Sequence, residues 1–326
     1  MLTIPSLPIM LAVQLGFGIT SVLTMWAAII KFIRILGDEN EQGKLYGLFF
    51  AFSGAAGAIM GFGGTALYSA MGQDVAAFKA LVLFYIVFVS VPGIIFALTF
   101  KEQEAFPEKG SENEKINFSD IKKIVKMPIV WVLIIIVYAS FIPKSSMTYF
   151  QPYMEEFYGV PVAIISVIAI IRVQVIRLLI TPLSGWFTDK FHSVALTLRI
   201  GFIVGIIGAV IVLLTPHHSQ YAWMIIIALF LFATLYNVGM ASYFIPISEA
   251  GIPAKYTGTI TGVVSVIGFS SDIFYYNIAG GLIDNNGASG YTMIFGLCLI
   301  CCIIGYIFSV ILKRTIKKTK EAKILN

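Results

Sequence analysis

The sequence predicts an all-α, polytopic membrane protein, and three observations lead to that fold class. Of the 326 residues, 58% are hydrophobic and only 12% are charged, whereas soluble domains carry roughly 25% charged residues. The mean hydropathy is +0.90. Apolar runs of about 20 residues, the length that an α-helix needs to cross a bilayer, recur along the chain. The alternating polarity of transmembrane β-strands is absent, so we expect a helical bundle.

Nine stretches are apolar enough, over a window of about 19 residues, to cross a membrane. A single long polar stretch, KEQEAFPEKGSENEKINFSDIKKIVK, separates the third stretch from the fourth. The sequence therefore predicts an N-terminal helical bundle at 1–100, a linker at 101–127, and a C-terminal six-helix bundle with a basic tail at 128–326. The nine predicted spans are 8–30, 45–70, 77–100, 128–150, 161–186, 194–215, 221–245, 257–282 and 290–313.

Lysine and arginine divide the connections into two sides. The linker and the C-terminal tail KRTIKKTKEAK are basic, and on the opposite side only Lys79 lies near a span boundary. By the positive-inside rule, we expect the linker and the C-terminus in the cytoplasm and the protein in the cell membrane. The tail is then a topology signal that needs no nucleic acid, while a specific lipid or partner site in it remains open.

Metal, cofactor and enzyme chemistry have no support in the sequence. Thiolate metal sites need companion ligands, so the three cysteines, which share one apolar run, are interpreted as packing residues. The histidines occupy short connections, and no intramembrane cluster of His, Asp or Glu is present. An ATP-binding GxxxxGK[ST] motif is also absent. The residues concerned are Cys298, Cys301, Cys302, His192, His217 and His218.

Two connections repeat each other, EQGKLYGLFFAFSGAAGAI at 41–59 and IPAKYTGTITGVVSVIGF at 252–269. Each places a Lys, an aromatic residue and a Gly at the start of a glycine-rich helix. Transporters are often built from three-helix repeats. The spans then form three sets, 1–100, 128–215 and 221–313, and the last two sets make one six-helix half.

The loop after the fifth span carries the most specific motif. The run Gly185-Trp186-Phe187-Thr188-Asp189-Lys190, followed by Arg199, resembles the loop motif of the major facilitator superfamily, in the copy between helices 8 and 9. The segment KFIRILGDENEQGKLYG is similar to that family's helix 4 to 5 connection, and the linker to its central loop. The resemblance covers nearly the whole chain. It implies family helices 4 to 12, without the first three helices and the principal copy of the motif.

The resemblance implies a gating role for this loop. Asp189 is then expected at the start of the helix that opens at Gln42-Gly43-Lys44, where free backbone N–H groups stabilise a carboxylate. Lys190 and Arg199 would act as local charge partners, and Gly185 belongs to the same motif.

The resemblance also implies a substrate site near the bilayer midplane, exposed alternately on the two sides. Counting about 1.5 Å per residue from Pro161, Arg172 lies roughly 17 Å deep and Arg177 roughly 24 Å. Arginine at such depth must face protein, water or a counter-ion. We expect Arg172 to bind an anionic group of the substrate. Arg177 lies roughly 140° further round and is assigned to structural pairing or to the cytoplasmic mouth; a structural ion pair is the alternative for both.

Two further ionisable residues lie within spans. Lys144 follows Pro143, which can open the helix backbone, and is expected either to contact substrate or to extend to the outer interface. Asp272 is the only carboxylate deep in a span. It is either the counter-ion of Arg172 or Lys144, or a proton carrier, and both roles combine if substrate displaces it. Expected neighbours in the cavity are Gln174, Tyr149, Tyr236, Asn237, Trp26, Ser145, Ser146, Tyr275 and Asn277.

The function expected from these features is secondary transport of a small organic anion, coupled to protons, by a monomer in the lipid bilayer. A sugar acid, a phosphate ester or another carboxylate would match the basic residues. The alternative hypothesis is a non-transporting, truncated membrane fragment of such a carrier.

Overall fold

The computed structural model describes residues 7–20, 25–38, 41–72, 74–99 and 118–324. These residues form helices and contain no strand, which confirms the predicted fold class. Eight helical stretches among them are long and apolar enough to cross a membrane, and they correspond to the last eight predicted spans. The first predicted span, 8–30, is only partly described, because 21–24 lie outside the described residues.

The helices before the predicted linker are α1 (Leu7–Ile19), α2 (Ala27–Leu36), α3 (Gln42–Ala70) and α4 (Val75–Thr99). The later helices are α6 (Phe118–Val125), α7 (Pro128–Ser146), α8 (Phe150–Tyr158), α9 (Val162–Ile170), α10 (Ile176–Phe191), α11 (Val194–Leu214), α12 (Ala222–Ser242), α13 (Ile245–Glu249), α14 (Ala254–Gly268), α15 (Ser271–Asn286) and α16 (Ala288–Ile324). Three short helical segments complete the order: the 3-10 turns η3 (Met147–Tyr149) and η5 (Ser219–Tyr221), and the π-helical η4 (Ile171–Val175).

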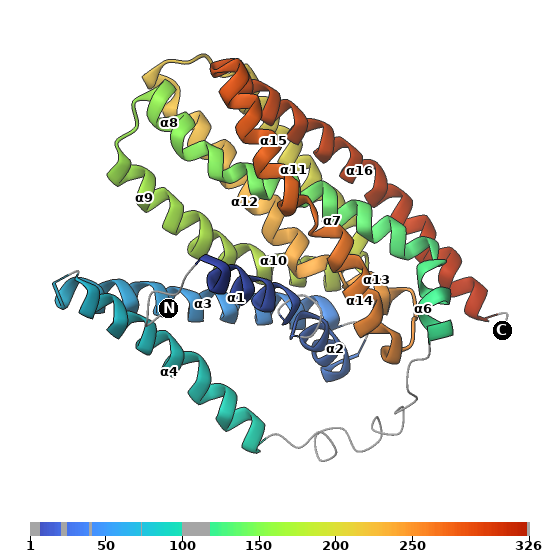
Figure 1. Cartoon of the computed structure of the whole chain (residues 1–326). Coiled ribbons are helices and arrows are strands. Elements are labelled where there is room, and N and C mark those ends of the chain that lie inside the picture. Colours follow the sequence, from blue (N-terminus) through green and yellow to red (C-terminus); the bar gives the residue numbers. More distant parts are fainter. Residues whose placement is uncertain (1–6, 21–24, 39–40, 73, 100–117, 325–326) are drawn as a thin grey trace.

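Helices α7 to α16 form one bundle, against which α3 lies, while α4 is at the periphery (Figure 1). One side of α4 packs on α3, where Phe84 and Tyr85 lie next to Gly63 and Gly64, and most of its other side chains are exposed in the described part of the chain. The buried core includes residues of α2 and α3 as well as of α7, α11 and α14, such as Ile30, Phe50 and Val137. Helices α2 and α3 therefore share one hydrophobic core with the bundle.

The predicted linker, 101–127, is described only from residue 118 onward. That last part forms α6, which packs against α7 and α14. The side chain of Ile124 is buried, and the indole Nε1 of Trp131 donates a hydrogen bond of 2.8 Å to the carbonyl of Val125. The end of the polar stretch is thus attached to the bundle by a short amphipathic helix.

Helices α3 and α10 approach each other closely because glycines face each other across their contact. A Cβ built on Gly185 of α10 would overlap the backbone of Gly43, and one built on Gly47 would lie 2.7 Å from the carbonyl oxygen of Thr181. Small residues at such positions let helix backbones approach in a membrane, where close packing is a principal source of helix association.

Asp189 adds a polar contact to this glycine interface. Its Oδ1 accepts a hydrogen bond of 2.9 Å from the amide of Gly43, and its Oδ2 accepts one of 2.6 Å from the amide of Lys44. Both amides belong to the first turn of α3, where backbone N–H groups have no partner within the helix. The carboxylate lies in the last turn of α10. This helix ends at Phe191, and the residue after it, His192, has a left-handed φ of 47°. The start of α3 therefore offsets the unfavourable interaction of Asp189 with the dipole of its own helix.

The glycine contact predicts a stability difference between two chemically identical substitutions. Gly185→Ala adds a methyl group that overlaps α3, and such overpacking costs about 1–3 kcal/mol. Gly296→Ala in α16 adds the same group where nothing lies within 4 Å. Unfolding in mixed micelles should show a loss of stability in Gly185→Ala but not in Gly296→Ala. Equal stabilities would show that α3 and α10 are not packed this closely.

The Asp189 contact predicts a change in backbone protection. Asp189→Asn removes the charge that strengthens two hydrogen bonds, each worth about 1.5–3 kcal/mol. Hydrogen exchange of the Gly43 and Lys44 amides should then accelerate roughly tenfold or more, as measured by mass spectrometry of peptides from this segment. Asp284→Asn, which changes an exposed carboxylate of α15, should leave that exchange unchanged. Unaltered exchange in Asp189→Asn would contradict the contact.

Candidate functional site

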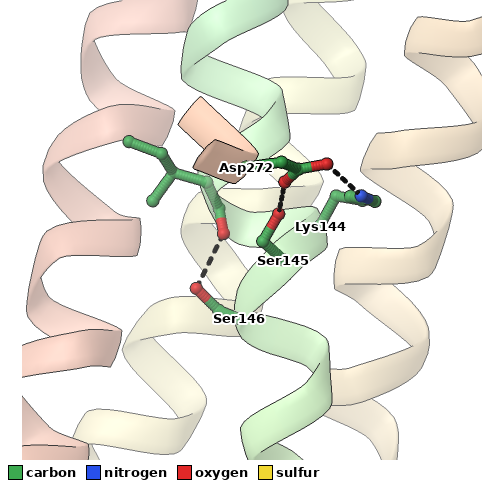
Figure 2. Close-up of polar contacts among 5 residues, drawn as sticks. Lys144, Ser145, Ser146 and Asp272 are labelled. Atoms are coloured by element: carbon green, nitrogen blue, oxygen red, sulfur yellow. Dashed lines mark hydrogen bonds and ion pairs between the residues drawn. The ribbon is translucent and has the colours of Figure 1, made fainter. Parts of the chain in front are cut away.

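The end of α7 and the start of α15 meet at an ion pair. Lys144 Nζ lies 2.7 Å from Asp272 Oδ2, and the hydroxyl of Ser145 donates a hydrogen bond to Asp272 Oδ1. Figure 2 shows both side chains of α7 directed at the one carboxylate. Each carboxylate oxygen of Asp272 thus has one partner from α7. Lys144 precedes Asp272 by 128 residues in the sequence, and Ser145 precedes it by 127.

Two spans change their hydrogen-bond pattern next to these groups. Pro143 lies inside α7, which ends at Ser146 and continues as the 3-10 turn η3. The other span changes between α14, which ends at Gly268, and α15, which begins at Ser271 and carries Asp272 in its first turn. The backbone stays in the right-handed helical region through both junctions, and the amide of Asp272 donates a hydrogen bond of 3.2 Å to the carbonyl of Phe269. Each span therefore remains one helical stretch, and α7 meets α15 where the hydrogen-bond pattern of the two spans changes.

The ion pair is accessible as well as paired. The side chains of Lys144 and Asp272 retain 26% and 33% of their exposure. The described residues therefore enclose the pair only in part.

The hydroxyl of the neighbouring residue, Ser146, forms a second polar contact between α7 and α15. It donates a hydrogen bond of 2.7 Å to the carbonyl of Ile142 and shares a short hydrogen bond with the hydroxyl of Tyr275 in α15 (Figure 2 draws the first). The thiol of Cys298 in α16 lies 2.9 Å from the same serine oxygen. Ser146 therefore connects α7, α15 and α16 next to the ion pair.

Aromatic rings cover the ion pair and link it to the N-terminal helices; we call this group the aromatic layer. Lys144 Nζ lies 5.2 Å from the ring centre of Phe141. The ring of Phe141 stacks on that of Phe269, with ring centres 4.4 Å apart. Trp26 lies 6.4 Å from Phe269 and its Nε1 is buried without a hydrogen-bond partner among the described residues. The members of the layer are Trp26, Phe50, Phe141, Tyr236, Phe244 and Phe269.

Arg172 lies in the π-helical segment η4 and is half-buried. Its Nε is buried and has no hydrogen-bond partner among the described residues, and the structure shows no ion pair between Arg172 and Asp272. Of the two cations considered for Asp272, Lys144 is the one in contact. Single π turns occur frequently at functional sites, and this one presents an arginine with an unused donor.

Gln174 and Arg177 lie on the side of α10 and η4 that faces α3. A Cβ built on Gly57 would lie 3.6 Å from the side-chain oxygen of Gln174, and one built on Gly54 would lie 3.2 Å from Cδ of Arg177. The guanidinium carbon of Arg177 is 5.8 Å from the ring centre of Phe50. Arg177 therefore packs on α3 beside the aromatic layer, in a cation–π arrangement.

The remaining predicted binding residues differ in how far their polar groups are engaged. The hydroxyl of Tyr149 donates a 3.2 Å hydrogen bond to the carbonyl of Tyr276. Asn237 is buried and donates to the carbonyl of Ala233 in its own helix at 2.8 Å. The ring of Tyr236 packs edge-on against Phe141 of the aromatic layer, with ring centres 5.8 Å apart.

The predicted charge partners of Asp189 lie elsewhere. Lys190 Nζ lies 4.6 Å from the ring centre of Trp186, and Nε of Arg199 is buried without a hydrogen-bond partner among the described residues. Neither forms an ion pair with Asp189 in the part of the chain that the structure describes. Lys190 lies instead against the rings of Trp186 and Phe191, and the carboxylate of Asp189 is bound by the backbone amides of α3.

Sequence reasoning missed the phenylalanines of the aromatic layer and the contact of Cys298 with Ser146. The chain has 26 phenylalanines, and no local signal separates a ring that covers a charge from one that faces lipid. The described residues contain no group of three or more His, Cys, Asp or Glu that could hold a metal ion.

Two proteins of similar sequence are described as inner membrane proteins. The chain is 27% identical over 309 residues to the inner membrane protein YihN of Escherichia coli K12, covering 94% of this chain and 73% of that protein. It is 27% identical over 284 residues to the inner membrane protein YqcE of the same strain, covering 86% and 67%. It is also similar, at 24% over 321 residues, to the uncharacterized protein MG294 homolog of Mycoplasma pneumoniae. The family model of the Major Facilitator Superfamily matches residues 1–276. With its membrane-type helices and a match over most of its length, the chain belongs to the Major Facilitator Superfamily of membrane transporters.

Proposed function

We propose that this protein is a secondary transporter of a small organic anion, coupled to protons and working by alternating access in the cell membrane. The observation that carries the proposal is the partly exposed Lys144–Asp272 ion pair between the spans that contain α7 and α15. Internal charges are costly in a membrane and mark substrate or proton pathways. Secondary transporters typically bind their substrate and coupling ion near the bilayer midplane.

The ion pair supplies a mechanism for coupling. In the empty protein Asp272 neutralises Lys144. A substrate carboxylate or phosphate that binds Lys144 displaces Asp272, which then carries a negative charge without its partner. Taking up a proton removes that charge, so one anion and one proton enter together. The Nε of Arg172 and the buried Nε1 of Trp26, which have no hydrogen-bond partner among the described residues, supply further donors.

The Asp189 contact supplies a gate at the opposite end of α10 from η4. Separating α3 from α10 requires the carboxylate to leave the two amides at the start of α3. Because these groups lie on the basic side of the chain, the gate closes the cytoplasmic side, where the C-terminus also lies. The monomer contains both the site and the gate, and no cofactor enters this mechanism.

The role of Arg172 predicts a loss of uptake. Arg172→Ala removes charge-assisted hydrogen bonds worth about 1.5–3 kcal/mol each, so uptake of the transported anion should fall roughly tenfold to a hundredfold. Arg314→Ala, in the exposed tail, is the matched control and should retain uptake. The assay is uptake of a panel of labelled organic anions by proteoliposomes under an imposed pH gradient. Equal uptake by both variants would remove Arg172 from the site.

The role of Asp272 predicts a change in energy coupling. Asp272→Asn cannot exchange a proton, so accumulation driven by a pH gradient should be abolished, while exchange of labelled for unlabelled anion across the membrane persists. Asp284→Asn, at the exposed end of α15, should keep both activities. Persistence of gradient-driven accumulation in Asp272→Asn would refute proton coupling through this carboxylate.

A further inference from the structure

A cavity lies at the end of the bundle where α10 ends, and its lining residues differ from those of the ion pair. It has a volume of about 400 Å³, and the loop at His192, the short helix α13 and the last part of α16 line it. Three of its lining residues are lysines of α16, Lys313, Lys317 and Lys320. Their spacing of four and three residues places them on one face of the helix.

The two carboxylates that line this cavity accept hydrogen bonds from backbone amides at the starts of other helices. Asp189 accepts hydrogen bonds from the first turn of α3, and Glu249 Oε2 accepts one of 3.1 Å from the amide of Val194 at the start of α11. The partial positive charge of each helix start offsets each carboxylate. Lys317 has an additional ion pair with Glu321 at 3.7 Å, but both side chains are largely exposed, at 80% and 57%, and exposed pairs of this kind contribute little. The cavity therefore has a surplus of positive charge.

The position of the lysines along α16 points to the membrane surface. The stretch from Tyr291 to Leu312 carries no charge, and at about 1.5 Å per residue it measures roughly 33 Å, close to the thickness of the hydrocarbon layer. Lys313 is the first charged residue after it, at the depth of the phospholipid headgroups. The side chains of Ile245 and Ile316 give the same cavity an apolar part. This combination of cations and apolar surface suits an amphiphile better than a free inorganic anion.

We propose that this cavity binds the phosphate-containing headgroup of an anionic phospholipid, with Lys313 and Lys317 as its principal cationic contacts. Basic residues next to a membrane span attract anionic headgroups with about 1 kcal/mol per lysine. The cavity adds what a diffuse basic tail lacks, which is a defined face of α16 against α13 and the His192 loop. The proposal is independent of the transported solute, because these lysines take no part in the Lys144–Asp272 site.

The test uses the purified full chain titrated with phosphatidylglycerol or phosphatidylcholine and analysed by native mass spectrometry. Lys317→Gln should weaken phosphatidylglycerol binding roughly tenfold or more, because it removes a charge-assisted hydrogen bond to the phosphate, and Lys313→Gln/Lys317→Gln should weaken it further. The matched control, Arg314→Gln/Lys318→Gln, removes the same net charge from residues that do not line the cavity. It should retain binding within about twofold, and phosphatidylcholine should bind all variants weakly and alike.

Three outcomes would overturn the proposal. Equal losses in the two double variants would mean diffuse attraction by the tail. Unchanged phosphatidylglycerol binding in Lys313→Gln/Lys317→Gln would mean that the cavity does not bind the headgroup. Displacement of phosphatidylglycerol by millimolar inorganic phosphate, in competition with the folded wild-type chain, would mean a site for free anions.

Discussion

The contact between Asp189 and the start of α3 is the interaction on which the arrangement of the two halves depends. A carboxylate in the last turn of α10 is unfavourable by itself, and two free amides at the start of α3 are costly in a membrane. Each group satisfies the other at 2.9 and 2.6 Å. The contact is short enough only because glycines lie opposite each other, with Gly185 against Gly43. Through α3, it holds the N-terminal helices on the shared core.

The candidate site depends on a different contact, the meeting of α7 with α15. An isolated charge in an apolar bundle is costly, and here Lys144 and Asp272 neutralise each other. The last turn of α7 lies against the first turn of α15. There Ser145 and Lys144 bind one carboxylate, and Ser146 binds Tyr275. The polar groups are thus held by two short contacts on neighbouring residues, while the pair remains partly exposed.

Four groups of cations in the chain have different environments. Lys144 has a carboxylate partner, and Arg177 lies against an aromatic ring. The buried Nε of Arg172 has no hydrogen-bond partner among the described residues, and its place within a span supports the proposed substrate contact. The lysines of α16 lie at the end of an uncharged stretch, where water and headgroups reduce the cost of their charge. The partner of each cation, more than the residue type, separates these roles.

The sequence by itself determined the helical fold class and the last eight spans, because hydropathy and length are local properties that a bilayer selects directly. It also indicated Arg172, Lys144 and Asp272 as unusual, since a charge in an apolar run is visible in one dimension. Tertiary structure alone decided which cation contacts Asp272, because Lys144 lies 128 residues away and Arg172 was equally compatible with the pattern. It also decided that α3 amides, and not Lys190 or Arg199, bind Asp189. The aromatic layer likewise became visible only in three dimensions, because rings from α3, α7, α12 and the α14–α15 junction gather there, with Trp26 just before α2, and the sequence does not encode which helix faces meet.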